Sequence, residues 1–436
     1  MYYLLSLFLL FFPYVTEESV WPHWRGPNAN GTAPTAQPPI QWDGSTGKNI
    51  KWKVPLRGRG SATPIICQNQ IFIVSAEKTD RLAKPEELPK PPEGIQQMTT
   101  PPKHFYRFLV TSYDQATGKV LWQKTATEAV PHEGHHETHS YAAGSPTTDG
   151  KKLYVSFGSF GIFCYDLQGN QLWERQLGKL ITRRGWGEAV TPVYHQGKLL
   201  INWDQEKGAA LFCLDAETGK TLWKADRDEV TTWTTPLVTE YQGKTLVIMN
   251  GTKRIRCHDL ADGKVLWSCA GMTTNAIPSV LRFGDAIISM SGYQGSHAVS
   301  IPLSSTGDLG TDGKVNWRYH TGTPYVPSPV QVEDRIYFTS ANGNLLTILD
   351  ATTGKPIIEK QRIPGARQFY ASPLYADGRL YFTDRDGVTV VLQPGNEIKV
   401  MATNKLGDAV DASPVAVGKQ LFLRGEQFLW CLEMLK

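Results

Sequence analysis

The chain has 436 residues, with 40 glycines, 28 prolines and 11% aromatic residues. This composition is typical of a protein rich in turns and strands and not of a helical bundle. Its 45 basic and 41 acidic side chains are mixed along the sequence without long runs of one sign, which excludes the electrostatic footprint of a nucleic-acid-binding protein.

The first twelve residues, MYYLLSLFLLFF, form an apolar stretch that is too short to span a bilayer comfortably. We interpret residues 1–20 as a signal peptide, and the alternative is a misassigned start codon. No cysteine follows the stretch as a lipid attachment point. We therefore expect an exported, periplasmic or extracellular, soluble protein without an integral membrane segment, in which residues 21–48 form an N-terminal extension.

Internal repeats dominate the rest of the chain. A proline that follows a small, polar or aliphatic residue recurs at intervals of 41 to 51 residues, after one longer first step of 82 residues. A period of 40 to 50 residues is the signature of a β-propeller. The eight pairs are Thr63-Pro64, Ser145-Pro146, Thr191-Pro192, Thr235-Pro236, Ile277-Pro278, Ser328-Pro329, Ser372-Pro373 and Ser413-Pro414.

Each proline opens a β-hairpin, as in SPLYADGRLYFTD, and a third strand then ends at an acidic residue before a turn into a fourth. The turns read DQATGKVLW, DAETGKTLW and DLADGKVLW, where Asp caps the turn and Gly supplies a positive φ. Four strands cannot bury both faces of their sheet, so such units stack radially. We predict an all-β, eight-bladed propeller of four-stranded antiparallel blades, with the tryptophan of each turn packed between blades.

The two ends of the propeller are predicted to complete one blade. The last unit, residues 413–436, has only three strands, whereas residues 49–54 form an isolated strand before the first unit. Pairing them closes the ring and removes an exposed sheet edge. The propeller then occupies residues 49–436, and a proline-rich insertion at about residues 77–106 in the first blade is predicted to be a surface loop or lid.

The cysteines fit the repeat better than a disulfide framework. Cys164, Cys213, Cys257 and Cys431 occupy equivalent positions just before an acidic residue, in CYD, CLD, CHD and CLE. Residues at equivalent positions fill the same buried niche in successive units, so we predict buried free thiols, with disulfides as the alternative in an exported protein.

The Asp-x-x-x-Gly-Lys-x-x-Trp turns and Ser-Pro pairs resemble the pyrroloquinoline-quinone (PQQ) repeat β-propellers over about residues 21–436. Together with WPHWRGPNANG and HEGHHETHS, they resemble the exported PQQ-binding-like branch common in planctomycete-type bacteria. More distant relatives imply two different activities: quinoprotein alcohol dehydrogenases are enzymes, and BamB-like lipoproteins are binding scaffolds. The vicinal cysteine pair usual in the quinoprotein enzymes is absent from this sequence.

Candidate site residues come from two sets of connections that share one face of a propeller, those that precede each proline and those between the second and third strands. This face forms a funnel that suits a small ligand. The candidates are Arg184, Trp186, Glu188, Asp204, Glu206, Trp233, Lys253, Arg254, Asn275, Tyr325 and Tyr370, and the same face also carries Tyr293, Arg385 and Asp411.

Several of these candidates have more than one interpretation. Arg184, Glu188, Asp204 and Glu206 could form an acid–base set or inter-blade salt bridges. Trp186, Trp203 and Trp233 could stack on a planar ligand or pack against the blades. His135, His136 and His139 lie on a histidine-rich loop and could bind Zn²⁺ or another divalent metal, or hydrogen-bond at the funnel rim.

Three functional hypotheses follow. The first is a monomeric scaffold that binds a protein or glycan partner, without nucleic acid, through the funnel or the insertion. The second, implied by the resemblance, is a PQQ- and calcium-dependent dehydrogenase with Glu188, Asp204 or Glu206 as the base. The third is a metal-dependent protein centred on His135 and His139.

Overall fold

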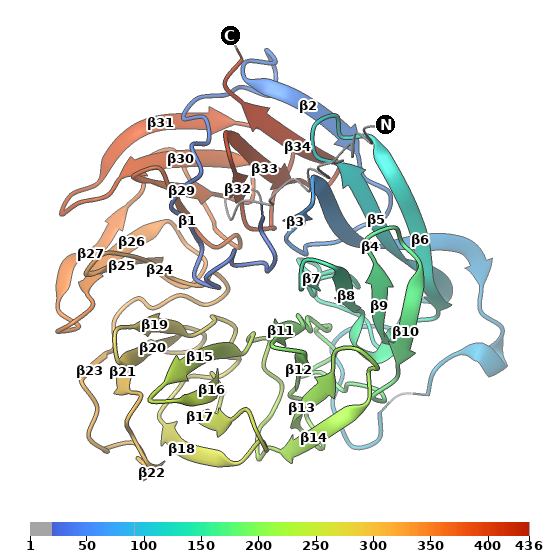
Figure 1. The fold of residues 1–436 in the computed structure, drawn as a ribbon, viewed down its shortest axis with the longest axis horizontal. Helices are drawn as coiled ribbons and strands as arrows, with labels where there is room; N and C mark the ends of the chain where they lie inside the picture. Colours follow the sequence, from blue (N-terminus) through green and yellow to red (C-terminus); the bar gives the residue numbers. More distant parts are fainter. Residues whose placement is uncertain (1–19, 91, 436) are drawn as a thin grey trace, which may run out of the picture.

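The computed structural model describes residues 20–90 and 92–435, so the predicted signal peptide lies outside the described residues apart from Val20. Eight sheets surround a central axis, and each is built on four antiparallel strands, which follow one another in the chain in most blades (Figure 1). The predicted all-β, eight-bladed propeller is confirmed. Its helical content in the described part is limited to short 3₁₀ turns such as η2 (Pro85–Glu87) and η3 (Gly158–Phe160).

The blades follow one another around the ring in chain order. The first four blades are made of β3 (Ile65–Cys67), β4 (Gln70–Leu82), β5 (His104–Asp114) and β6 (Val120–Ala129); β7 (Thr147–Thr148), β8 (Lys152–Ser156), β9 (Ile162–Asp166) and β10 (Gln171–Arg175); β11 (Val193–His195), β12 (Lys198–Trp203), β13 (Ala210–Asp215) and β14 (Thr221–Asp226); and β15 (Leu237–Tyr241), β16 (Lys244–Met249), β17 (Arg254–Asp259) and β18 (Val265–Ala270).

The fifth blade is irregular, because a segment before its outer strand crosses to the fourth blade, where β22 (Gly307–Asp308) pairs parallel to β18. The remaining blades are made of β19 (Leu281–Phe283), β20 (Ala286–Ser291), β21 (His297–Pro302) and β23 (Trp317–Tyr319); β24 (Val330–Val332), β25 (Arg335–Thr339), β26 (Leu345–Asp350) and β27 (Pro356–Arg362); β28 (Leu374–Ala376), β29 (Arg379–Thr383), β30 (Val388–Gln393) and β31 (Lys399–Lys405); and β32 (Val415–Val417), β33 (Gln420–Arg424) and β34 (Phe428–Glu433).

Strand β2 (Ile50–Pro55) completes the eighth blade. It pairs antiparallel with β34, with Ile50 opposite Leu432 and Val54 opposite Leu429. The predicted closure of the ring by the N-terminal strand is therefore confirmed, and the edge of β34 is covered.

The tryptophans of the outer strands join neighbouring blades as predicted. The indole N–H of Trp173 in the second blade donates to the Ala216 carbonyl of the third at 3.1 Å, and its ring lies on Gly219 of the same turn. A side chain at position 219 would collide with the ring, because its Cβ would lie 2.7 Å away. The same arrangement recurs for Trp52 on Gly118, Trp122 on Gly169, Trp223 on Gly263 and Trp317 on Gly354.

A belt of hydrogen bonds around the axis joins residues that lie next to the regularly spaced prolines. The backbone N–H of Thr63 donates to the Ser145 hydroxyl, and Ser145 N–H donates in turn to Thr191. From the fifth blade onward the chain of bonds runs through Ser279, Ser328, Ser372 and Ser413 and returns to Thr63. Where the belt is open, the Asn202 and Asn250 amides donate to the carbonyls of Thr234 and Pro278. The hydroxyl residues thus fix the spacing of the blades at the axis.

The N-terminal extension lies across one mouth of the ring, a role that the sequence analysis did not predict. Its β1 (Thr32–Ala33) pairs parallel to β28, and Trp21 forms a bridge to Ile66. Gln37 N–H donates to Gly418 in the turn between β32 and β33. Arg25, 1% exposed, reaches the Pro329 carbonyl of the sixth blade. We call residues 21–38 the plug, seen in dark blue in front of the ring in Figure 1.

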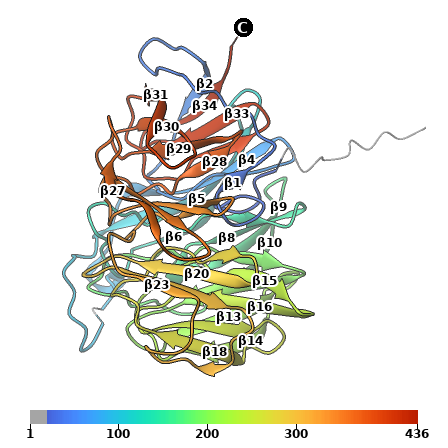
Figure 2. The same cartoon turned by 90° about the vertical axis from the view of Figure 1, so that its left-hand side faces the viewer.

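The insertion and the plug lie on opposite faces of the ring. The plug contacts the face with the turns between the first two strands of a blade, as at Gly418, whereas the insertion joins the end of β4 to the start of β5 on the other face. It protrudes from the left of Figure 2. Both strands continue into the predicted insertion, so the connecting segment spans only residues 83–103. It reaches the third blade, where Lys207 Nζ donates to Glu93 O at 2.9 Å, and Met98 N–H donates to Arg184 O at 2.9 Å.

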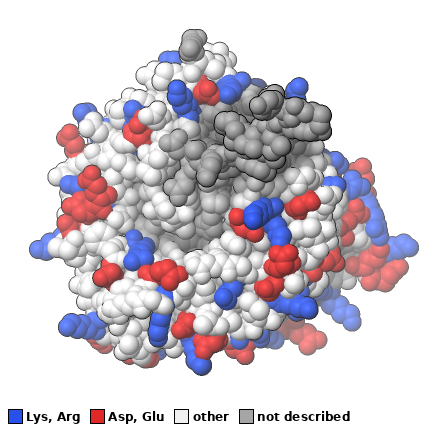
Figure 3. Space-filling model, viewed as in Figure 1, with Lys and Arg blue, Asp and Glu red and all other residues white. Residues whose placement is uncertain are grey.

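The remaining sequence predictions concern thiols, charge and membrane segments. All six cysteines are buried and free, and burial raises the pKa of Cys164, Cys213 and Cys257 to about 12. Charges of both signs alternate over the face that carries the plug (Figure 3). Within residues 20–90 and 92–435, no helix is both long and apolar enough to cross a membrane.

Candidate functional site

The funnel face contains a cavity of about 340 Å³ on the axis of the ring. Each of the eight connections that lead into an innermost strand contributes to its wall, and the connection between β20 and β21 adds one more residue. In chain order these residues are Ser61, His136, Thr138, His139, Ala143, Trp186, Ala189, Trp233, Ile277, Tyr293, Tyr325, Val326, Tyr370 and Asp411.

Aromatic side chains form most of the wall. Tyr293 and Tyr325 stack with ring centroids 4.7 Å apart and an interplanar angle of 29°, and Trp186 meets Tyr293 edge-on at 6.3 Å. The indole N–H of Trp233 donates to Gly187 O at 2.8 Å, which ties the connection into β15 to the connection into β11. Rings that are fixed by such contacts offer a pre-organised apolar surface to a ligand.

Asp411 is the one carboxylate in the wall, and it is paired. Arg385 donates to both carboxylate oxygens, at 2.7 Å through Nε and 3.2 Å through Nη2, and this pairing raises the pKa of Arg385. The Arg385 guanidinium also lies over the Tyr370 ring, 4.2 Å from its centroid. The pair therefore leaves this part of the wall polar without net charge.

The three predicted histidine ligands do not assemble a metal site. His135 Nδ1 faces His136 O at 2.7 Å, His136 Nδ1 faces the Thr138 hydroxyl at 2.8 Å, and burial lowers the pKa of His139 to about 4. Across the described ranges, no three His, Cys, Asp or Glu side chains come together as a group that could hold a metal ion. The alternative, hydrogen bonding at the funnel rim, describes His136 and His139.

The predicted site residues separate into two groups. Six of them line the cavity: Trp186, Trp233, Tyr325, Tyr370, His136 and His139. The others lie outside its wall: Arg184, Glu188, Asp204, Glu206, Lys253, Arg254, Asn275 and His135. Arg184 lies behind the wall, with its guanidinium over the Trp186 ring at 5.5 Å.

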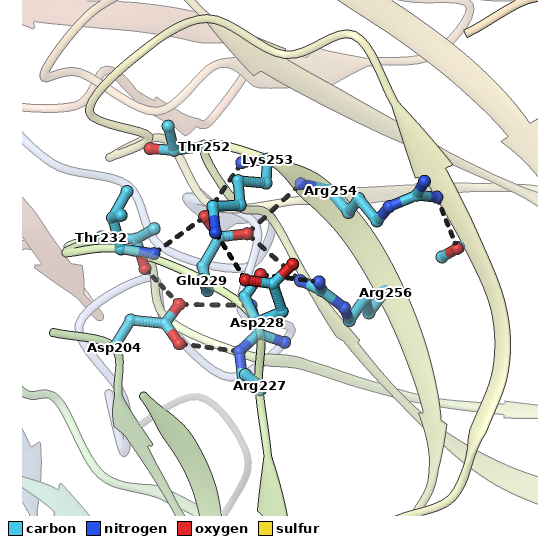
Figure 4. Close-up of polar contacts among 12 residues, drawn as sticks. Asp204, Arg227, Asp228, Glu229, Thr232, Thr252, Lys253, Arg254 and Arg256 are labelled. Carbon is cyan, nitrogen blue, oxygen red and sulfur yellow. Dashed lines mark hydrogen bonds and ion pairs between the residues drawn. The ribbon is translucent and has the colours of Figure 1, made fainter. Parts of the chain in front are cut away.

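Asp204 belongs to an ionic network between the third and fourth blades (Figure 4). It pairs with Arg227 at 2.7 Å, both side chains being 0% exposed, and it accepts from the Thr232 hydroxyl. Arg227 also contacts His258 of the fourth blade. The structural interpretation of Asp204, an inter-blade salt bridge, is therefore the one that the geometry supports.

Glu229 holds the neighbouring part of the network together. It accepts hydrogen bonds from the backbone N–H groups of Lys253 and Arg254 and from the Arg256 side chain (Figure 4). The Lys253 ammonium pairs with Asp228, and the Arg254 guanidinium pairs with Asp308. Both cations are therefore paired with carboxylates outside the cavity wall.

Glu206 and Glu188 also have structural partners. Glu206 accepts from the Thr231 hydroxyl at 2.8 Å. Glu188 accepts from Ser159 N–H at 2.7 Å beside a small pocket of about 20 Å³, which Glu133 also lines. Burial raises the pKa of Glu188 to about 8 and raises that of Glu133 as well. The insertion touches this pair, because Gln97 donates to Glu133 at 3.2 Å.

Comparisons with known proteins agree with this architecture. The family model of outer membrane protein assembly factor BamB, a PQQ-repeat model, matches residues 107–309. The crystal structure of BamB from Moraxella catarrhalis superposes with a TM-score of 0.52 at 13% identity, over 82% of this chain and 97% of that chain. Over residues 107–309 the chain therefore resembles the BamB-like propellers of PQQ repeats.

The same ring occurs in proteins that have little sequence in common with this chain. A computationally designed protein, Ika8, superposes with a TM-score of 0.52 at 10% identity, over 78% of this chain and 98% of that chain. No curated protein matches the chain in sequence. At these identities the superpositions establish the fold alone, and the activity has to be argued from the cavity.

The cavity of this propeller does not fit PQQ with calcium. PQQ is a flat tricarboxylate and needs cations around it, whereas the charged side chain in the wall is Asp411, already held by Arg385. Calcium takes six to eight oxygen ligands, and the described residues contain no acidic cluster of that kind. Only the aromatic rings of the wall suit the flat ring system of the cofactor, and the wall offers no partners for its three carboxylates or for calcium.

Proposed function

We propose that the protein is an exported binding or assembly scaffold that holds its partner in the funnel cavity. One observation carries the proposal: all eight connections into the innermost strands send a side chain to the same cavity. A concave, mainly apolar site with a few polar groups is the usual form of a ligand site.

The contacts of the other candidates support binding over catalysis. Asp204, Glu206 and Glu188, the residues considered as a base, are each engaged by groups of the blades and lie outside the cavity wall. The plug lies across the mouth of the ring opposite the funnel face, and the funnel face is the one that carries the insertion. A partner would therefore approach from that side.

Photo-crosslinking in cells tests this proposal. Benzophenone reacts with C–H bonds of proteins and glycans alike, so a benzoylphenylalanine at Tyr293, in the wall, reports either partner. The matched control carries it at Leu172, which is 48% exposed on β10 at the outer rim. We expect defined adducts in the extracytoplasmic fraction from position 293 only. Identical adduct patterns from both positions, or a cytoplasmic location, would contradict the proposal.

A further inference from the structure

The eight connections divide the cavity wall into two continuous arcs. Five consecutive connections supply Trp186, Trp233, Ile277, Tyr325 and Tyr370, and the three that follow supply Asp411, Ser61 and the segment with His136, Thr138 and His139. One side of the cavity is thus aromatic and aliphatic, and the other side carries hydroxyl, carboxylate and imidazole groups. A ligand that fills it needs an apolar face and a polar edge.

A cationic ligand does not suit the aromatic arc. Cations bind over the faces of aromatic rings, but two of these rings already carry a guanidinium of the protein. Arg184 lies 5.5 Å from the Trp186 centroid and Arg385 lies 4.2 Å from the Tyr370 centroid. A second cation at either ring would be repelled by the first.

An anionic ligand does not suit the polar arc either. The cavity wall offers no lysine or arginine, and the Arg385 guanidinium is already engaged by Asp411 and so is not free to pair with an anion. At the edge of this arc, Arg59 is likewise paired with Glu426. Charge on the ligand is therefore disfavoured in both directions, and an uncharged group remains.

The polar arc keeps both donors and acceptors for such a group. Each Asp411 oxygen accepts one bond from Arg385 and retains a second lone pair. His136 and His139 engage protein groups through Nδ1, and in the described part of the chain their Nε2 atoms have no protein partner. An apolar side chain of a peptide would leave these groups without partners, which costs binding free energy.

We propose that the funnel cavity binds an uncharged pyranose ring of an oligosaccharide. The C–H face of the ring packs on the aromatic arc, where the negative quadrupole of the rings attracts it. The hydroxyl groups of the sugar both donate to and accept from the polar arc. This assignment rests on the proposed function, because it names the class of partner that the same cavity holds.

A glycan array tests the assignment with the purified chain. The probes are immobilised neutral hexose, pentose and N-acetylhexosamine oligosaccharides, with uronic-acid oligosaccharides as charged counterparts. We expect binding to neutral members, and titration of the best one should quench tryptophan fluorescence because Trp186 and Trp233 line the cavity. Binding to no neutral glycan, or preference for the uronic-acid series, overturns the assignment.

Variants locate the binding in the cavity. Tyr325→Ala should weaken affinity roughly tenfold by removing a stacking ring, Tyr325→Phe should retain most of it, and Asp411→Asn should weaken it without changing the fluorescence of Trp186 and Trp233 in the free protein. Leu172→Ala on the outer rim is the control. Equal affinities of Tyr325→Ala and the control at an unchanged melting temperature overturn the assignment.

The two proposals fail in different ways. If the array is blank while Tyr293 gives protein adducts in cells, the sugar assignment is wrong and the funnel scaffold remains. If neither experiment shows binding that depends on the cavity residues, the proposed function is wrong as well.

Discussion

Asp204 and Arg227 show how a charged pair inside the ring differs from one at its surface. Both side chains are 0% exposed, and Thr232 supplies a further hydrogen bond to the carboxylate. Removing one partner of a buried pair leaves the other charge without compensation in a medium of low polarity. The pair therefore fixes the end of the third blade, and Arg227 links it to His258 of the fourth blade.

Asp204→Asn should lower the free energy of unfolding by about 3–5 kcal/mol, because Arg227 stays buried without a counter-charge. Urea denaturation measures the loss. Asp228→Asn is the matched control, since its partner Lys253 is half-exposed and Asp228 itself is 86% exposed. Equal stabilities of the two variants would show that Arg227 finds another partner.

Glu188 makes stability depend on pH. Burial raises its pKa from 4.5 to about 8 in the folded protein. The neutral carboxyl thus contributes stability that is complete below about pH 4.5 and is lost as the pH rises toward 8. In Glu188→Gln this dependence should disappear, and urea midpoints between pH 5 and pH 9, expressed as wild type minus variant, measure it. A difference that does not change with pH would contradict the assignment.

At the residue scale, the sequence predicts some site residues and not others. The aromatic residues Trp186, Trp233, Tyr325 and Tyr370 are found by their place just before each innermost strand. Position alone does not give side-chain direction, so charged neighbours such as Arg184 and Glu188 were grouped with them although they turn to other partners. Small residues such as Ser61 and Thr138 line the cavity without any signal in the sequence that separates them from ordinary loop residues.

At the scale of elements, the tryptophan contacts explain why a glycine recurs in the turns. Gly219 has a φ of 69° and carries the Trp173 ring of the preceding blade. Gly197, in the hairpin turn of the same blade, has a φ of 78° but nothing within 4 Å of its missing Cβ. The two glycines thus share the backbone requirement and differ only in the contact.

Gly219→Ala should therefore cost about 1–3 kcal/mol more than Gly197→Ala, because both variants strain a positive φ but only the first displaces the tryptophan. Thermal unfolding of the two variants, with Trp173 fluorescence as a local probe, measures the difference. If the melting temperatures fall equally, backbone strain accounts for the whole effect and the ring has moved without cost.

Elements that repeat were predictable, and elements that occur once were not. The hairpins and turns predict the blades, because eight copies of one pattern of hydrophobic residues and turns reinforce one another. The plug has no copy elsewhere in the chain, and its contacts, such as Arg25 with Pro329, join residues far apart in sequence. The path of the insertion over the third blade and the pairing of β22 with the fourth blade are unpredictable for the same reason.

At the scale of the molecule, the seam between the first and eighth blades is built like four other interfaces of the ring, those of Trp122, Trp173, Trp223 and Trp317. Trp52 of β2 donates to Gln115 O of the first blade at 3.2 Å and lies on Gly118, as Trp173 does on Gly219. Because the seam uses the same contacts as these four interfaces, we expect that it does not separate before them.

Trp52→Ala and Trp173→Ala should each lose roughly 3 kcal/mol and still unfold in one transition. Circular dichroism and fluorescence followed together in urea measure this, and the two curves should coincide for both variants. A separate early transition in Trp52→Ala alone would show that the seam opens independently of the other interfaces.

Closure by β2 also sets an order of events during synthesis. Ile50 of β2 is synthesised early but pairs with Leu432 of β34, so the eighth blade cannot be completed until the end of the chain has been made. Contacts between such distant positions form slowly, because a long loop must close before they stabilise anything. A nascent chain that stops short of β34 leaves both strand edges of the seam unpaired. Chaperones and proteases can recognise these exposed edges, which are covered in the finished ring.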